Sequence, residues 1–260
     1  MIGQFVAAAI IVWYLCRFKT APLSLSHFRP KLSVTGFVAK LGTANFFNQI
    51  AMMIVQIVMN KSLTYYGSQS VYGESIPLAC AGIITKVGMV FFSICIGLSQ
   101  GMQPIVSFNY GAGNYKKVKQ AYRLAAGIGT IISVIAFFAF QIFPRQLIGI
   151  FGSSQNEAYY TFAVRYFRIY MFFTFLNAIQ PISSNFFTAI GKPGKGIFLS
   201  LTRQIIFLLP LIVIFPLFLG VDGIMYAGPI ADFIAAMVSM ILIYKEFGKI
   251  NKLEEATCES

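Results

Sequence analysis

The sequence IGLSQGMQPIVSFNYGAGNYKK, residues 96–117, decides the fold class. Its first half is an apolar run that predicts a membrane-spanning helix, yet it carries Gln100, Gln103 and Pro104. The run then breaks at residues 109–113, which are rich in glycine, and meets a basic cluster that begins at Lys116. A helix that serves only as an anchor needs no carboxamides inside the bilayer. The stretch therefore predicts a membrane protein in which polar side chains work inside the helical bundle.

The composition extends this prediction to the whole chain. Of the 260 residues, 57% are hydrophobic and 11% are charged, whereas a soluble domain is about 25% charged. A spanning helix needs about 20 mostly apolar residues. Apolar segments, separated by glycine, proline and charge clusters, fall at residues 2–16, 36–60, 77–108, 121–143, 158–190, 197–219 and 223–244. The sequence thus predicts a multi-pass protein whose principal environment is the lipid bilayer.

The net charge of +12 could indicate a nucleic-acid partner, but the basic residues lie in alternate loops. These basic groups lie within residues 17–31, 116–123, 192–203 and 245–252. Loops rich in Lys and Arg remain in the cytoplasm. We therefore expect no nucleic-acid partner, a cytoplasmic C-terminus, and a place in the plasma membrane, most simply a bacterial inner membrane.

The segments predict an all-α integral membrane protein: a unit of six helices preceded by one short or truncated transmembrane helix. The apolar run at residues 2–16 would rise only about 22 Å as a helix, less than the hydrocarbon core of about 30 Å, so residues 1–16 are predicted to be a partial transmembrane helix. Residues 17–34, which include a solvated His27, are predicted to form a cytoplasmic linker before the six-helix unit. Residues 35–246 form the six-helix unit, and residues 247–260 form a polar cytoplasmic tail.

Motifs for catalysis are lacking in the sequence. It contains no His pair, no H-E-x-x-H, no G-x-S-x-G and no phosphate-cradling loop after a strand. The cysteines Cys16, Cys80, Cys95 and Cys258 have no C-x-x-C spacing and are predicted to be packing residues. We therefore predict no catalytic residue, no metal site, no resident cofactor and no enzyme activity.

Polar residues recur at helical spacing within three of the segments. The second segment carries Asn45, Gln49, Gln56 and Asn60, with Asn48 beside them; the third carries Lys86, Ser93, Gln100 and Ser107; the fifth carries Asn177, Gln180, Ser184 and Thr188. Such stripes either bond neighbouring helices together or line a water-filled pathway. Packing is favoured for Ser and Thr, and a cavity for the Asn and Gln residues. The candidates for a substrate cavity are Asn45, Asn48, Gln49, Gln56, Lys86, Gln100, Gln103, Asn177, Gln180 and Ser184.

Lys86 and Asp232 stand out as a cation and an acid placed well inside apolar segments. An unpaired charge there is costly. A direct Lys86–Asp232 pair is one hypothesis, and snorkelling of Lys86 or contact with backbone carbonyls are the alternatives.

The motif Gly97-x-x-x-Gly101-x-Gln103-Pro104-Ile105, followed by Asn109-Tyr110-Gly111-Ala112, resembles the end of the eighth helix and the next loop of the multidrug and toxic compound extrusion (MATE) transporters. Further resemblances are Ala189-Ile190-Gly191-Lys192-Pro193, Leu201-x-Arg203-Gln204 and Gly220-Val221-Asp222-Gly223. The resemblance implies two six-helix lobes that alternate access and export amphipathic, cationic small molecules against inward Na⁺ or H⁺. It also implies that residues 35–246 are a six-helix C-terminal transporter lobe, that residues 1–16 end a first lobe joined to it by residues 17–34, and that an N-terminal lobe completes this chain.

The chain departs from that pattern at two positions. By the resemblance, Asn48 and Asn177 stand at cation-site positions where the sodium-coupled branch has acids. Carboxamides carry no negative charge and exchange no proton, so coupling through this lobe is in doubt. Two other interpretations remain open. One is a lipid-linked oligosaccharide flippase of the same superfamily, for which Lys86, Arg165, Arg168 and Arg203 would matter, and the other is a non-transporting membrane fragment.

Overall fold

The computed structural model describes residues 2–16, 32–151 and 157–258, and these residues form helices and turns without a strand. They fall into two units, residues 1–45 and 46–260, which are described separately. The first unit holds α1 (Ile2–Cys16) and the beginning of α2 (Leu32–Ser68). Most of the predicted linker, including His27, lies outside the described residues, as does the side chain of Asn45.

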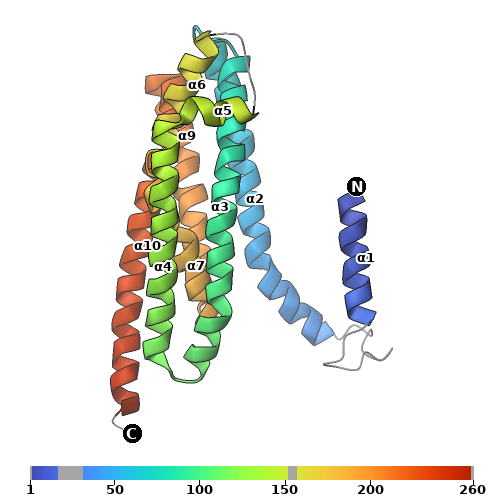
Figure 1. Cartoon of the computed structure of the whole chain (residues 1–260), viewed down its shortest axis with the longest axis vertical. Coiled ribbons are helices and arrows are strands. Elements are labelled where there is room, and N and C mark those ends of the chain that lie inside the picture. Colours follow the sequence, from blue (N-terminus) through green and yellow to red (C-terminus); the bar gives the residue numbers. More distant parts are fainter. Residues whose placement is uncertain (1, 17–31, 152–156, 259–260) are drawn as a thin grey trace. The chain divides into compact units, whose positions relative to one another are not determined.

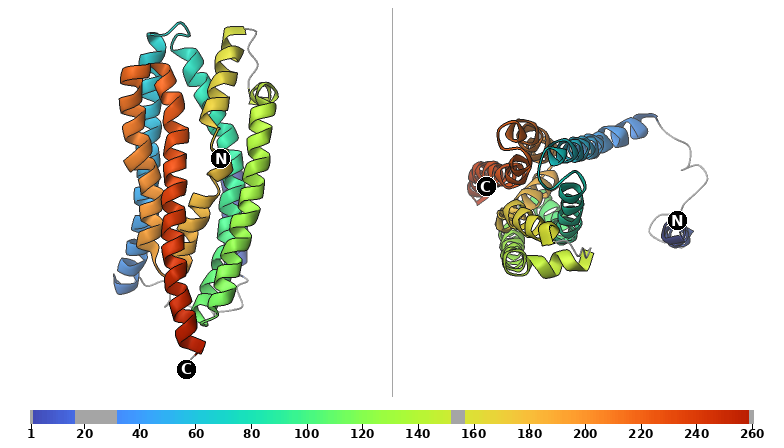
Figure 2. Two further views of the ribbon diagram at one scale, coloured as in Figure 1. Left: turned by 90° about the vertical axis from the view of Figure 1, so that its left-hand side faces the viewer. Right: turned by 90° about the horizontal axis from the view of Figure 1, so that it is seen from above.

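The second unit is a bundle of long helices that run side by side (Figures 1 and 2). After the rest of α2 come α3 (Ser75–Gly111), α4 (Tyr115–Ile142), α5 (Pro144–Phe151), α6 (Glu157–Tyr170), a 3₁₀ turn (Thr174–Leu176), α7 (Ile179–Ala189), α8 (Pro193–Leu201), a π-helical stretch (Thr202–Leu208), α9 (Leu209–Leu219) and α10 (Val221–Cys258). The short α5 lies across the end of the bundle opposite the C-terminus (Figure 1).

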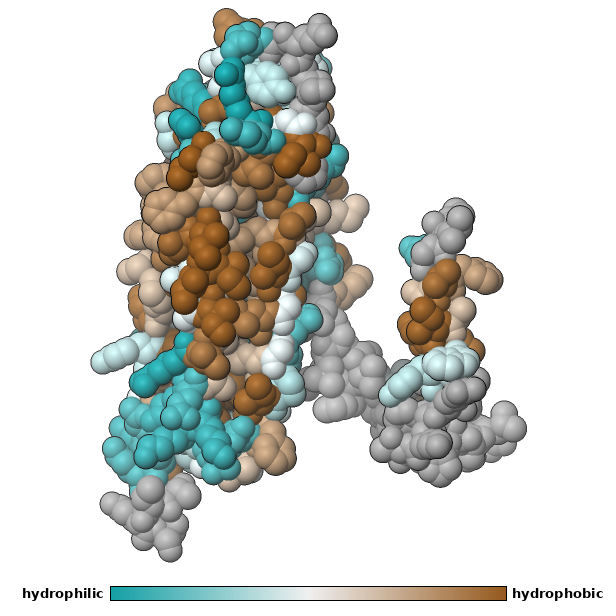
Figure 3. All heavy atoms as spheres, viewed as in Figure 1, coloured by the Kyte–Doolittle hydropathy of each residue, from teal (hydrophilic) through white to brown (hydrophobic). Residues whose placement is uncertain are grey.

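The length and hydropathy of these helices suit a bilayer. Among the described residues, four helical stretches are long and apolar enough to cross one, at residues 75–111, 115–142, 193–219 and 221–255. The path through α2 and the interrupted path through α6 and α7 complete the six-helix lobe. On the face in Figure 3, hydrophobic residues dominate the middle of the bundle and hydrophilic residues its ends. The predicted all-α, six-helix architecture is confirmed.

The fifth predicted segment, residues 158–190, is not one continuous helix. It is interrupted between Tyr170 and Ile179, where only the short 3₁₀ turn is regular. Pro181 explains the position of the break, because a proline ring clashes with the carbonyl group four residues earlier, here that of Asn177, and lacks an amide donor. Asn177 therefore lies outside α7 and does not share a regular helix face with Gln180 and Ser184.

A second irregularity lies in the next crossing, where α8 and α9 are joined by the π-helical stretch. Pro210 follows that stretch closely, and its ring would clash with the carbonyl of residue 206 in a regular α-helix. A wider π-turn can accommodate such a conflict, and π-bulges are frequent at functional sites. The bulge carries Arg203, so it determines where this guanidinium lies.

Close packing of helices holds the lobe together, since lipid provides little hydrophobic drive between helices. The largest fully buried side chains include Phe162, Tyr166, Phe167, Phe186 and Phe187. Gly129 of α4 permits a close approach to α7, because an added Cβ would lie 2.6 Å from Cδ1 of Ile182 and 3.1 Å from Cβ of Ala178. A larger residue at Gly129 would force α4 and α7 apart.

Ion pairs fasten the basic loops to the second half of α10. The carboxylate of Glu246, which is 1% exposed, accepts hydrogen bonds from Lys192 and from Lys195, the latter at 2.5 Å. The bond to Glu246 raises the pKa of the Lys192 ammonium, while burial opposes the rise. At the start of α4, Lys119 Nζ lies 2.5 Å from Glu254 Oε2. Part of the basic charge thus stabilises the end of the bundle.

Candidate functional site

The polar stripes of α2 and α3 lie on faces that the rest of the lobe leaves uncovered. Gln49, Gln56, Lys86 and Gln100 are exposed, whereas Asn48 and Gln103 are half-buried. Gln56 Nε2 donates to Asn60 Oδ1 on the same helix at 2.9 Å. Both stripes are therefore available to contact something outside the described lobe.

The third stripe points into the lobe. Ser184 Oγ donates to the carbonyl of Gly196 at 2.8 Å, and an added Cβ at Gly196 would lie 2.6 Å from the carbonyl of Ser184. Gln180 is half-buried. Ser184 thus bonds α7 to α8 across a close helix contact, which is the packing role that the sequence favours for serine.

A buried polar cluster joins the interrupted helix, the π-helical stretch and α10. Its centre is Asp232, which is 6% exposed. Arg203 contacts Asp232 Oδ1 through Nε and Nη2, each at 2.6 Å, and Asn177 Nδ2 donates to Oδ2 at 2.9 Å. Both carboxylate oxygens are therefore engaged, and the charge of Asp232 is balanced by one guanidinium.

Aromatic rings enclose this cluster. The Arg203 guanidinium carbon lies 5.4 Å from the ring centre of Phe92 on α3, within the range of cation–π attraction. Tyr170, the last residue of α6, packs against Gly228, where an added Cβ would lie 2.4 Å from the ring. The rings keep the ion pair away from lipid, so the cluster combines charge balance with shielding.

The hypothesis of a Lys86–Asp232 pair is wrong. Asp232 is paired with Arg203, and Lys86 is exposed without an ion pair to any described residue. The sequence grouped Arg203 with the basic loop, but the chain winds through the π-helical stretch before α9 and brings this arginine to α10. Lys86 is instead a cation on the uncovered face of α3.

Several connecting residues were missed at the level of sequence. Asn185 Nδ2 donates to Ser99 Oγ at 2.6 Å and links α7 to α3, and Tyr122 Oη lies 2.9 Å from Ser183 Oγ between α4 and α7. The sequence did offer a signal for Asn185, because this carboxamide directly follows Ser184 of the predicted polar stripe.

Among the described residues, no group of three or more His, Cys, Asp or Glu side chains could hold a metal ion.

Comparison with known proteins places the lobe in a family. The MatE family model matches residues 44–214, which is more than half of the chain. The chain belongs to the MATE family. Its relatives include the multidrug export protein MepA of Staphylococcus aureus, 24% identical over 243 residues, and that of Staphylococcus saprophyticus, 25% identical over 236 residues. The alignments cover 92% and 90% of this chain but 51% and 49% of the relatives.

Solved structures agree with this MATE fold. An outward-facing multidrug resistance MATE transporter matches with a TM-score of 0.82 at 19% identity, over 96% of this chain and 55% of that chain. A superfamily transporter from Pyrococcus furiosus, described as having a binding pocket of reversed polarity, matches with a TM-score of 0.82 at 18% identity and the same coverage. The chain thus spans about half the length of the transporters it matches.

Within this MATE lobe, the two positions implied as cation sites differ in their surroundings. Asn48 is half-buried on α2, while Asn177 is buried and bonded to Asp232. A carboxylate therefore does lie beside Asn177, but it comes from α10 and already has a partner in Arg203. Sequence reasoning along α7 alone could not place it there.

Proposed function

We propose that the protein forms the C-terminal half of a xenobiotic:cation antiporter that exports amphipathic, cationic small molecules across the plasma membrane. The observation that carries the proposal is the uncovered carboxamide pattern of α2 and α3, in particular Gln49, Gln56 and Gln100. An exposed polar stripe on a spanning helix is costly against lipid but suits a wet cavity between two lobes. The relatives named multidrug export proteins support the substrate class.

Apolar residues beside these carboxamides add to the argument. Phe46, Phe47, Met53 and Met89 are all more than half exposed. Ligand sites for drug-sized molecules combine apolar and aromatic surface with few polar groups, and aromatic faces attract cations. The exposed Lys86 would disfavour a cation close to it, so we expect the substrate to bind nearer to Gln100, about 21 Å further along α3.

The buried cluster bears on the coupling ion. A sodium ion or a proton that uses Asp232 has to compete with Arg203, which holds Oδ1 at 2.6 Å. A guanidinium fixed in place satisfies a buried carboxylate without any ion from solution. We therefore propose that the lobe contributes substrate surface, and that the Na⁺ or H⁺ coupling carboxylate belongs to a partner N-terminal lobe.

An ethidium efflux assay tests the proposal in a bacterial strain without its own major pumps. One arm expresses the chain alone, and the other expresses it fused behind the first half of MepA from Staphylococcus aureus. We expect export in the fused arm only. Export by the chain alone would overturn the half-transporter proposal. Correct membrane insertion without export in either arm would favour a non-transporting membrane fragment.

A pair of matched variants tests the cavity surface in the fused arm. Gln100→Leu should lower the efflux rate about fivefold, because one hydrogen bond contributes about 1 kcal/mol. Gln120→Leu, an exposed carboxamide on the first turns of α4, should leave it unchanged. Equal effects of the two substitutions would contradict the assignment of Gln100 to the cavity. Rescue of a strain that cannot move lipid-linked oligosaccharide, without ethidium export, would instead support the flippase alternative.

A further inference from the structure

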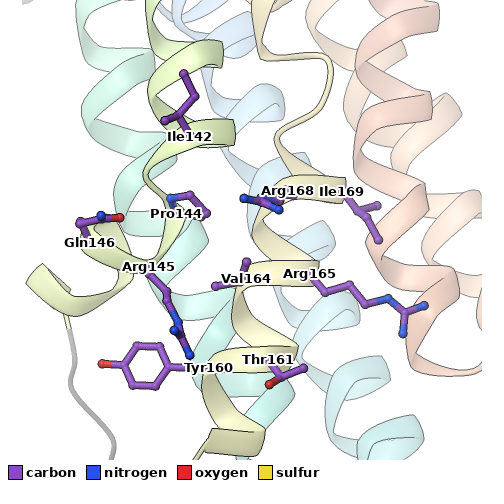
Figure 4. A pocket seen from close by; sticks show the side chains of 10 residues that line it. All are labelled: Ile142, Pro144, Arg145, Gln146, Tyr160, Thr161, Val164, Arg165, Arg168 and Ile169. Atoms are coloured by element: carbon purple, nitrogen blue, oxygen red, sulfur yellow. The ribbon is translucent and has the colours of Figure 1, made fainter.

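An open hollow of about 640 Å³ lies where the end of α4 meets α5 and α6 (Figure 4). Figure 1 places this meeting point at the end of the bundle opposite the C-terminus. Its lining divides into a basic part and an apolar part. The basic part comprises Arg145, Arg165 and Arg168, and the apolar part includes Ile142, Val164 and Ile169. The hollow is thus suited to a ligand that has an anionic and an apolar end.

The charges around the hollow leave one positive charge in excess. Arg145 Nη2 lies 2.7 Å from Glu157 Oε1, and Arg165 Nη2 lies 2.7 Å from Asp222 Oδ2. Arg168 makes no ion pair with any described residue. In Figure 4 the Arg165 side chain extends toward α10, whereas Arg168 extends toward Pro144 across the hollow. Arg168 therefore provides an unbalanced guanidinium at the centre of the basic part.

The apolar part continues as a track along α4. Ile131, Ile135, Phe138 and Ile142 are each at least 55% exposed. Their spacing of four, three and four residues places them on one helix face. The track leads along the apolar middle of the bundle and ends at the hollow. Its chemistry matches that of a hydrocarbon chain whose polar end lies beside Arg168.

The short helix α5 has the character of an interfacial helix. Ile148 is 1% exposed and Leu147 packs on the core, whereas Arg145 and Gln146 are exposed. The apolar face of α5 is covered by the bundle, and its polar face follows directly after the candidate membrane span at residues 115–142, where headgroups are expected. Since α5 crosses the bundle rather than running along it (Figure 1), the hollow beneath it lies at headgroup depth.

We propose that this hollow binds the phosphate of an anionic phospholipid of the phosphatidylglycerol type, with one acyl chain along the α4 track. The single excess charge of Arg168 matches the single charge of a phosphodiester, and guanidinium is well suited to phosphate because of its planar fork of donors. A free phosphate ion would leave the apolar part and the track without a ligand. The site serves lipid binding and does not depend on the proposed efflux activity.

Native mass spectrometry of the full 260-residue chain, purified in mild detergent, tests the proposal. The probes are phosphatidylglycerol, phosphatidylcholine and inorganic phosphate, titrated separately. We expect phosphatidylglycerol to be retained in preference to phosphatidylcholine, and inorganic phosphate not to displace it at equal concentration. Displacement by inorganic phosphate would show a free-anion site, and equal retention of both lipids would show non-specific lipid contact; each result would overturn the proposal.

Substitutions locate the site. Arg168→Gln should weaken phosphatidylglycerol binding about tenfold, since a charge-assisted hydrogen bond contributes at least about 1.4 kcal/mol. Arg168→Lys keeps the charge and should retain most of the affinity, so it remains informative if Arg168→Gln is poorly folded. Arg123→Gln, an exposed arginine near the other end of α4, is the control and should have no effect. Unchanged binding by Arg168→Gln, or an equal loss in Arg123→Gln, would overturn the assignment.

Discussion

Removal of the guanidinium that balances Asp232 provides a direct test of the buried cluster. In Arg203→Met the carboxylate, 6% exposed, would keep only the 2.9 Å bond from Asn177. Breaking a buried ion pair by removing one partner costs about 3–5 kcal/mol, and an unpaired acid in a spanning helix costs about 3 kcal/mol. Met also lacks the positive charge that faces Phe92. We therefore expect Arg203→Met to destabilise the lobe by about 3 kcal/mol.

The measurement is the midpoint of thermal unfolding of the detergent-purified chain, followed as the monodisperse fraction that survives heating. A loss of about 3 kcal/mol corresponds to a fall of roughly 6–12 °C for a chain of this size. The double variant Arg203→Met/Asp232→Leu removes both charges, and apolar replacement of a whole buried pair is often neutral. It should therefore unfold closer to the wild type than Arg203→Met does.

Lys117→Met is the control, because Lys117 is exposed in the basic group at the start of α4 and has no ion pair to a described residue. Its midpoint should stay within about 2 °C of the wild type, as expected for a surface substitution. The reasoning is refuted if Arg203→Met unfolds like the wild type. The single variant Asp232→Leu is measured as well. The reasoning is also refuted if the loss in the double variant equals the sum of the losses in Arg203→Met and Asp232→Leu, since the two side chains would then act independently.

Three further predictions concern packing, the end of α10 and topology. Gly228→Val should lower the unfolding midpoint, because an ideal Cβ at this position would lie only 2.4 Å from the Tyr170 ring. Overpacking of this kind costs about 1–3 kcal/mol, and an unchanged midpoint would contradict the contact. Glu246→Gln should lower the midpoint more than Lys192→Gln, because it removes the shared acceptor of two lysines while Lys192→Gln leaves Lys195 bound; the reverse order would contradict the arrangement. A green fluorescent protein fused to the C-terminus should fluoresce, and alkaline phosphatase there should be inactive, if this end is cytoplasmic; active phosphatase would invert the topology.

Periodicity and composition predicted the helices well where the helices are regular. The stripes of α2 and α3 follow an uninterrupted helical repeat, so the exposure of Gln49, Gln56 and Gln100 agrees with one polar face per helix. The repeat fails between α6 and α7, where Pro181 displaces the turn that holds Asn177. The proline was visible in the sequence, but Pro104 and Pro229 lie inside continuous helices, so a proline alone did not predict the break.

The partner of Asp232 could not be predicted in the same way. Arg203 follows the loop residues Lys192 and Lys195 in the sequence. Its position on an ideal α-helix does not indicate that its side chain faces α10. Its position depends on the π-helical stretch, which changes the direction of the side chain relative to a regular α-helix. Neither a helical wheel nor a count of charges predicts this change in the direction of the Arg203 side chain. The approach of α10 to α9 and the π-helical stretch is a tertiary property, so the choice between Lys86 and Arg203 required the structure.

Gln100, within the stretch at residues 96–117, bears on the environment of the lobe. In a bilayer, an exposed carboxamide or ammonium on a spanning helix faces either lipid or another polar surface. Lipid offers no hydrogen-bond partner, and a lysine at the centre of a spanning helix costs about 3 kcal/mol. Gln49, Gln56, Lys86 and Gln100 are all exposed in the lobe, although Asp232, in the same unit, is covered and balanced. The lobe thus satisfies its internal charges but leaves a polar surface uncovered. We infer that this surface belongs against water or a second lobe, which is the arrangement that the half-length match to the MATE transporters also favours.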